Sequence, residues 1–186
     1  MQLSRSTIAQ AAVDILDEYG LADVSMRRVA ASLDVAPGAL YWHVDNKQEL
    51  ICAMAEIIIA PVLERTYTGP REACAALREA VLSHRDGADV VATAAALPGA
   101  DIHAHLLDAV KATLSDGPSA DSERTALIDA TATGLLYLTL GAANMHQAGV
   151  QFNEAARQTS AATAPRGSVE HVEQAIDLLL AGLDAQ

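Results

Sequence analysis

The chain has 186 residues, of which 51% are hydrophobic and 3% aromatic, and its formal net charge is −12. This composition is sufficient for the core of one or two small domains, and the negative charge excludes binding to nucleic acid through overall positive charge. Alanine is abundant, and no stretch of strand length alternates β-branched with polar residues. We therefore expect an all-α fold.

The first predicted helix starts near Ser4 or Ser6, either of which can act as its N-cap, and it stops at Gly20. Its apolar residues recur at helical spacing and form one stripe, which consists of Ile8, Ala12, Ile15, Leu16 and Tyr19. One apolar stripe predicts a helix that packs against a core on one side.

Two short helices come next, Met26–Leu33 capped by Ser25 and then Pro37–Val44. Asp34 occupies a turn position that needs a positive φ, which aspartate tolerates better than most residues. Pro37 suits the first position of a helix because its φ is already helical. Three linking residues between two short helices are typical of a helix-turn-helix, whose second helix enters the major groove of DNA.

The rest of the chain also predicts helices. Asn46 and Glu49 have the spacing of a capping box for a helix that bends or ends near Pro61, and Gly69-Pro70 opens the next helix. Further helices are expected at about 88–96, 100–114 and 121–148, and a last one follows the loop Thr159–Gly167 and is capped by Ser168.

Gly134 and Gly141 are seven positions apart and therefore share one face of the predicted long helix. This smooth face, together with the leucine-rich last helix, suits a four-helix interface between two copies of the chain. Burial of the same glycines within one subunit is the alternative, and the sequence leaves it open.

No segment of the chain has the appearance of a membrane span or a leader. The longest apolar runs, around Ile57–Val62 and Gly134–Ala143, are shorter than the roughly 20 residues that a bilayer requires. We therefore expect a cytoplasmic protein without membrane contact. Cys52 and Cys74 lie on different predicted helices without metal-ligating neighbours at useful spacing, so we expect buried free thiols.

Two segments resemble the tetracycline-repressor (TetR) family of bacterial one-component regulators, and specifically its tetracycline-repressor branch. One is S-M-R-R-V-A-A-S-L-D-V-A-P-G-A-L-Y-W-H-V-D-N-K-Q-E-L at Ser25–Leu50, and the other is L-S-H-R-D-G-A at Leu82–Ala88. The resemblance implies a helix-turn-helix DNA-binding domain at 1–46, a connecting helix at 47–66, and a ligand-binding and dimerisation domain at 67–186. It also implies a homodimer that binds a double-stranded DNA operator and a small-molecule inducer.

The resemblance assigns DNA-contacting positions along this first segment. Arg27 falls at a base-contacting position, Arg28 borders the groove, and Trp42 lies either beside the contact surface or in the small core. The positions that contact phosphates or the groove are Tyr41, His43 and Lys47. Pro37, Gly38 and Ala39 replace base-reading side chains and offer shape and a methyl group, so we expect an operator that differs from the tetracycline operator.

The resemblance also assigns an expected ligand pocket. The family's magnesium-binding histidine corresponds to Val91, which cannot ligate a metal, so we expect neither a metal nor a cofactor and a more apolar inducer than magnesium–tetracycline. The expected pocket residues are Leu63, Ala73, Leu77, Val91, Thr133 and Tyr137. His84 belongs to the second matching segment, and we expect the backbone at the end of its helix to satisfy it.

The sequence carries no G-x-S-x-G, no H-E-x-x-H and no phosphate-binding glycine loop, so we do not expect an enzyme. We expect a homodimeric repressor that a ligand releases from a palindromic operator by tilting Lys47–Ile59, although activation stays open. The alternative is a dimeric ligand-binding or protein-interaction module that has lost DNA binding. Residues 1–60 favour that alternative, since they contain four basic and eight acidic residues.

Overall fold

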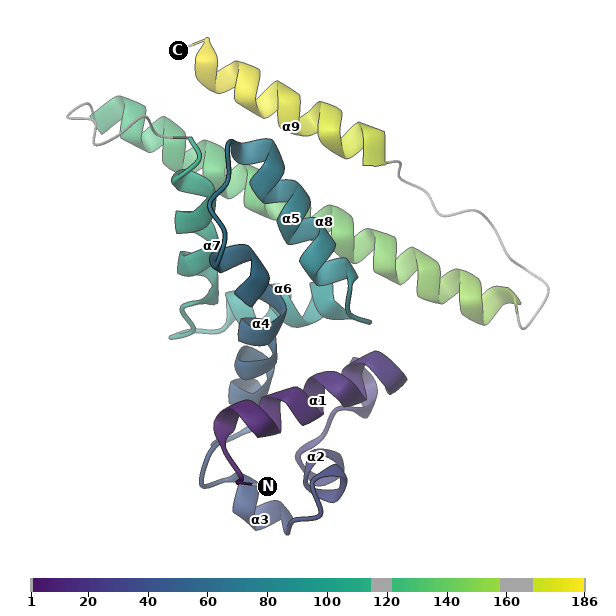
Figure 1. The fold of residues 1–186 in the computed structure, drawn as a ribbon. Coiled ribbons are helices and arrows are strands. Elements are labelled where there is room, and N and C mark those ends of the chain that lie inside the picture. The colour runs from purple at the N-terminus through teal and green to yellow at the C-terminus, as the bar shows by residue number, and fades with distance from the viewer. Residues whose placement is uncertain (1, 115–121, 158–168, 186) are drawn as a thin grey trace. The chain divides into compact units, whose positions relative to one another are not determined.

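The computed structural model describes residues 2–114, 122–157 and 169–185, and every regular element within those ranges is helical (Figure 1). This confirms the expected all-α fold. The helices divide into two compact units, one of residues 1–64 and 80–103, the other of residues 65–79 and 104–186. The first unit contains the helix-turn-helix together with residues 80–103. The domain boundaries expected at 46 and 66 stay a prediction.

The first unit begins with α1 (Arg5–Tyr19), which has the predicted caps. The side chain of Ser4 accepts a hydrogen bond from the Thr7 N–H at 3.2 Å, and the Ser4 N–H donates to Thr7 Oγ1 at 2.9 Å. At the other end, Gly20 has a φ of 91° and donates its N–H to the Leu16 carbonyl at 2.8 Å. A short 3₁₀ turn at Leu21–Asp23, which the sequence pattern did not predict, follows.

The helix-turn-helix consists of α2 (Met26–Ser32) and α3 (Pro37–Leu40). The Ser25 side chain accepts from the Arg28 N–H at 3.2 Å, and Asp34 has the expected positive φ of 54°. The third helix is shorter than predicted. After Leu40 the chain turns, and the N–H groups of His43 and Val44 both donate to the Leu40 carbonyl at 2.9 Å.

The helix α4 (Lys47–Leu63) has an N-terminal cap close to the predicted one. Asn46 Oδ1 accepts from the Glu49 N–H at 2.9 Å, but Glu49 Oε2 accepts from the Asp45 N–H at 2.5 Å and not from that of Asn46. The helix also continues two residues past Pro61. Since a proline costs most in a helix interior, its place near the C-terminal end makes it tolerable.

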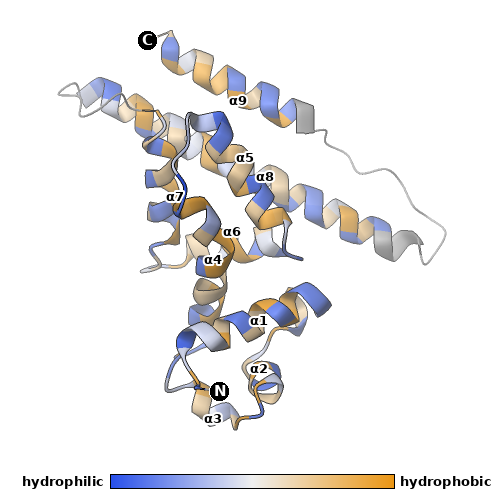
Figure 2. Ribbon diagram, viewed as in Figure 1, coloured by the Kyte–Doolittle hydropathy of each residue, from blue (hydrophilic) through white to orange (hydrophobic). Residues whose placement is uncertain are grey.

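The helix α6 (Gly87–Ala96) packs against α4 within the first unit. Both helices are predominantly hydrophobic along their length (Figure 2). The side chains of Met54, Ile58 and Ile59 on α4 and of Val90 and Val91 on α6 are at most 1% exposed. Burial on this scale stabilises the unit by about 1.5–3 kcal/mol for each large aliphatic side chain. The three-helix head is therefore built onto a hydrophobic helix pair.

The second unit contains most of α5 (Pro70–Leu82) and α7 (Ile102–Lys111), with α8 (Ser122–Arg157) and α9 (Val169–Asp184). Its core joins one or two buried side chains from each helix, namely Cys74, Val110, Ala132, Leu135 and Ile176. The helix α9 lies alongside α8 (Figure 1). The expected loop Thr159–Gly167 and the expected cap Ser168 fall outside the described residues.

The long helix α8 contains an 18-residue window of mean hydropathy 1.4, of which 33% is buried. By length and composition alone such a helix could cross a membrane. The sequence pattern did not predict this, because only its unbroken apolar runs were considered. However, Ala132, Leu135 and Leu136 of this helix are fully buried in the second unit. The core helix of a protein can pass the same test.

Candidate DNA-binding interface

The surface of the helix-turn-helix is defined by two buried residues four positions apart. Leu40 and Val44 are both 0% exposed, and they anchor the end of α3 in the head. The residues between them therefore turn outward. Tyr41 is 51% exposed, Trp42 is 88% exposed, and His43 is also exposed. The exposure of Trp42 excludes its placement in the small core, one of the two positions that the sequence left open.

Pro37 and Gly38 are exposed at the start of α3, and Ala39 is half-buried. A Cβ atom added to Gly38 would meet nothing within 4 Å, so the packing of the protein itself does not require a glycine there. The missing side chain leaves the backbone open to close approach by another molecule. This feature fits a recognition helix whose first turn contributes shape to the contact.

The two neighbouring arginines of α2 differ in their surroundings. Arg28 forms an ion pair with Asp23, and its guanidinium lies over the ring of Tyr19 at 3.8 Å from the centroid. Arg27 is exposed and has no hydrogen bond or ion pair with any residue that the structure describes. Arg27 is therefore available to a DNA base, whereas Arg28 is held against the protein.

The remaining basic residues of the head explain how an acidic chain can present positive charge locally. Arg5 forms a two-bond ion pair with Glu56, at 2.5 and 2.8 Å, which raises the pKa of the arginine. Lys47 is exposed at the first position of α4. A helix N-terminus favours anions, so Lys47 adds a full charge at a place that already suits a phosphate. Two basic residues, Arg27 and Lys47, thus stay uncompensated on the head surface.

Two aspartates that the sequence pattern did not single out connect the head to the start of α6 inside the first unit. Asp17 Oδ2 lies 2.9 Å from His84 Nδ1, and Asp17 Oδ1 accepts the Arg85 N–H at 3.2 Å. Asp86 Oδ2 accepts the Leu21 N–H at 2.7 Å. The expectation that backbone alone satisfies His84 is wrong, because a carboxylate distant in sequence lies beside it.

The six residues expected to bind ligand are divided between the two units. Leu63 (39% exposed) and Val91 (0%) belong to the first unit, and Ala73 (2%), Leu77 (1%), Thr133 (half-buried) and Tyr137 (59%) belong to the second. Ala73 and Leu77 lie four positions apart on α5, and both are buried. The Thr133 hydroxyl donates its hydrogen bond to the Asp129 carbonyl of the same helix at 2.7 Å.

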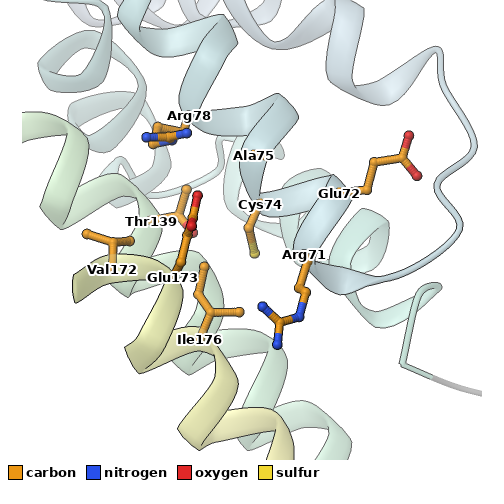
Figure 3. Close-up of a pocket in the computed structure, with 9 residues that line it drawn as sticks. All are labelled: Arg71, Glu72, Cys74, Ala75, Arg78, Thr139, Val172, Glu173 and Ile176. Carbon is orange, nitrogen blue, oxygen red and sulfur yellow. The ribbon is translucent and has the colours of Figure 1, made fainter. Parts of the chain in front are cut away.

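The structure contains a cavity of about 310 Å³ in the second unit, between α5, α8 and α9 (Figure 3). None of the residues expected to bind ligand lines it. Its lining consists of Arg71, Glu72, Cys74, Ala75, Arg78, Thr139, Val172, Glu173 and Ile176. Four of the five α5 members recur at positions i, i+3, i+4 and i+7, namely Arg71, Cys74, Ala75 and Arg78, and this helical spacing could have marked them as one face in the sequence.

Within the described ranges, no cluster of three or more histidine, cysteine, aspartate or glutamate side chains could hold a metal ion. Val91, at the position that corresponds to the family's magnesium ligand, is completely buried and offers no ligating atom.

Comparisons with known proteins agree with the geometry of the head. Residues 8–54 match the family model described as bacterial regulatory proteins, tetR family. Over 162 residues the chain is 32% identical to the tetracycline repressor protein class A from transposon 1721 of Escherichia coli, a match that covers 80% of this chain and 69% of that repressor. The chain belongs to the TetR family.

Solved structures extend this TetR-family match over the whole chain. The crystal structure of Mycobacterium smegmatis BioQ has a TM-score of 0.81 and 34% identity, and the match covers 99% of both chains. A crystal structure of BioQ with its natural double-stranded DNA operator has a TM-score of 0.76 and 34% identity over 100% of both chains. The resemblance inferred from Ser25–Leu50 and Leu82–Ala88 is thereby confirmed.

Proposed function

We propose that this TetR-family chain is a homodimeric transcriptional repressor that binds a palindromic DNA operator and leaves it when a small ligand binds. The observation that carries the proposal is the exposed surface around α3, where Arg27 and Lys47 are uncompensated, Gly38 is open, and Tyr41 and Trp42 point outward. The similarity to BioQ, which has been crystallised with its operator, supports this use of the surface.

Base recognition follows from the chemistry of these side chains. Arginine can donate two hydrogen bonds to a guanine edge, and lysine or tyrosine can bind phosphate oxygens and fix the register. Pro37, Gly38 and Ala39 contribute shape and a methyl group, so the operator differs from that of a repressor with polar residues there. His43 and Arg28 lie at the border of the contact.

Exposed apolar side chains on α8 and α9 support dimerisation. Tyr137, Met145 and Phe152 of α8 are 59%, 73% and 71% exposed, and Leu178 of α9 is 75% exposed. Large apolar side chains gathered on two neighbouring helices are typical of a protein interface. Two copies of α8 and α9 around a two-fold axis would form a four-helix interface and hold two recognition helices about 34–36 Å apart.

The proposed regulation assigns residues 1–46 to DNA binding, residues 47–66 to the connecting helix, and residues 67–186 to ligand binding and dimerisation. Ligand binding would tilt Lys47–Ile59 and change the spacing of the two recognition helices. To change operator occupancy from about 99:1 to 1:99, the ligand must prefer the non-binding state roughly 10⁴-fold, or by about 5.5 kcal/mol. Val91 removes the metal ligand, so the inducer is not magnesium–tetracycline.

A mobility-shift titration with the DNA upstream of the gene, against random DNA of the same length, tests the proposal. Trp42 is the single tryptophan of the chain and is 88% exposed in the head, so its fluorescence gives a second readout of operator binding. We expect specific binding that weakens with salt. The alternative is a dimeric interaction module that does not bind DNA, which would also be a cytoplasmic protein without enzymatic activity. It predicts weak affinity that is the same for upstream and random DNA.

A further inference from the structure

The cavity between α5, α8 and α9 combines an apolar wall with charged groups at its rim (Figure 3). Cys74 and Ile176 are buried at 2% and 6% exposure, and Val172 is half-buried beside them. A volume of about 310 Å³ lies at the lower end of the range of roughly 300–1,000 Å³ that is typical of small-molecule pockets. The occupant that this space fits is therefore a small molecule with an apolar body.

Two of the four charged residues that line the cavity already have partners. Arg71 forms an ion pair with Asp177. Glu72 accepts hydrogen bonds from the Thr68 N–H at 2.9 Å and the Thr68 hydroxyl at 2.8 Å, which lower the pKa of the carboxyl group. The hydroxyl of Thr139 donates to the Leu135 carbonyl at 2.7 Å. Arg71, Glu72 and Thr139 thus each have at least one partner within the protein.

Arg78 and Glu173 are different. Neither forms a hydrogen bond or an ion pair with any residue that the structure describes, although both line the cavity. Arg78 is half-buried on α5, whereas Glu173 is exposed on α9. A guanidinium that is partly removed from water gains more from a charged partner than an exposed carboxylate, which water already solvates. The charged group in the cavity that would gain most from a ligand is therefore the Arg78 guanidinium, and the ligand group that suits it is an anion.

We propose that this cavity binds a small amphipathic monocarboxylate, with its carboxylate on Arg78 and its apolar body against Cys74, Val172 and Ile176. The ligand carries a single negative charge because Arg78 is the one arginine of the lining without a partner among the described residues, and the carboxylate of Glu173 in the same lining would repel a dianion such as a phosphate monoester. The site would be the ligand-binding site of the proposed repressor, and to that extent the inference rests on the proposed function.

Octanoate is a suitable probe, with octanol and octylamine as neutral and cationic controls of the same chain length. Calorimetry on the full chain should show octanoate bound at least about tenfold more tightly than either control, since a charge-assisted hydrogen bond to a partly buried arginine is involved. Arg78→Gln should remove this preference and leave the affinity for octanol unchanged. Octylamine binding as tightly as octanoate would overturn the proposal.

Two variants serve as matched controls for charge. Arg65→Gln removes the same charge near the same helix. Arg65 lies outside the cavity lining, and Glu72, its ion-pair partner in the lining, keeps its two hydrogen bonds from Thr68, so octanoate affinity should change less than about twofold. Glu173→Gln removes a like charge from the rim and should tighten octanoate binding severalfold. Equal losses in Arg78→Gln and Arg65→Gln would mean that a general field attracts the carboxylate, and would contradict a site at Arg78.

Position in the cavity can be tested by occlusion and by protection. Ala75 is exposed on α5 and lines the cavity, so Ala75→Leu should fill its mouth without disturbing the core and abolish binding of octanoate and octanol alike. Burial raises the pKa of the Cys74 thiol, so a small methanethiosulfonate should convert it only slowly to the mixed disulfide, with release of methanesulfinate, and more slowly still with octanoate. Cys52, in the other unit, is an internal reference that octanoate should not protect.

The same samples separate this inference from the proposed function. Octanoate that protects Cys74 and needs Arg78, but leaves operator affinity unchanged, supports the site and contradicts ligand release through it. A chain that binds its operator but gives no heat and no Cys74 protection with millimolar octanoate overturns the site and leaves the DNA-binding function standing.

Discussion

Asp86 fastens the start of α6 to the segment that follows α1, because its Oδ2 accepts the Leu21 N–H at 2.7 Å. Asp86 itself has a φ of 56°, in the left-handed region that side chains other than glycine rarely adopt. A Cβ atom on Gly20 would lie 2.9 Å from the same carboxylate oxygen, so glycine at position 20 permits the close approach. A strained aspartate and a glycine distant in sequence therefore form one contact between the DNA-binding head and α6.

Replacing Asp86 with alanine should lower the free energy of unfolding by about 1–3 kcal/mol, because the Leu21 N–H loses its acceptor and alanine tolerates a positive φ poorly. Asp86→Gly loses the same hydrogen bond but relieves the backbone strain, so it should be less destabilising than alanine. Urea unfolding followed by circular dichroism measures both variants. If the Asp86→Ala variant were as stable as the wild type, this hydrogen bond would contribute nothing to the free energy of unfolding.

Arg27 and Arg28 form a matched pair for testing DNA recognition. Arg27→Ala should abolish specific operator binding without altering fold or dimer, since an exposed arginine that contacts a base contributes about 1–3 kcal/mol. Arg28→Ala should change operator affinity much less, because Arg28 is paired with Asp23 and stacked on Tyr19. The ratio of specific to random DNA affinity in mobility-shift titrations decides the assignment, and a larger loss in Arg28→Ala would reverse it.

Magnesium–tetracycline should neither bind nor release the operator. The side chain of Val91 is buried and has no ligating atom, and the side chains of Leu63, Ala73 and Leu77 have no polar atom that could contact tetracycline. Titration calorimetry with and without magnesium checks this expectation. Micromolar affinity that requires magnesium would contradict it, and would mean that side chains other than these bind the metal.

Local signals predicted most of the head correctly. Ser4, Ser25 and Asn46 all act as N-caps, Asp34 takes the positive φ and Pro37 opens α3, because each of these features depends on residues within one helical turn. The length of α3 was predicted less well. Leu40 and Val44 are buried at a helical spacing, yet the chain between them forms turns, and a periodic pattern cannot distinguish these two structures.

The contacts between distant segments could not be predicted in this way. Nothing near Asp17 or Asp86 in the sequence marks them as partners of residues more than sixty positions away. The cavity is a similar case, because Arg78 on α5 and Glu173 on α9 come together only through the packing of the second unit. Family resemblance also did not identify the cavity, since it assigned ligand contacts to other residues.

The two glycines of α8 test the dimer interface, and the structure separates them. A Cβ atom on Gly134 would lie 3.6 Å from Leu179 Cδ1, so this glycine faces α9 of its own chain. A Cβ atom on Gly141 would meet nothing within 4 Å. Gly141 therefore lies on a surface open to a second copy, whereas Gly134 already contacts α9 of its own subunit. That both glycines lie at a dimer interface stays a prediction.

Gly141→Leu should accordingly dissociate the dimer and leave the subunit folded. If two α8 helices meet there, an isobutyl group repeated across the two-fold axis should cost about 1–3 kcal/mol or more through overpacking. Operator affinity should fall as well, because the two recognition helices lose their fixed spacing although no DNA contact has changed. Gly134→Leu is the control, since it should clash with Leu179 and lower the stability of the subunit itself. Sedimentation equilibrium distinguishes the two effects, and a Gly141→Leu dimer that still binds its operator would place the interface elsewhere on α8 and α9.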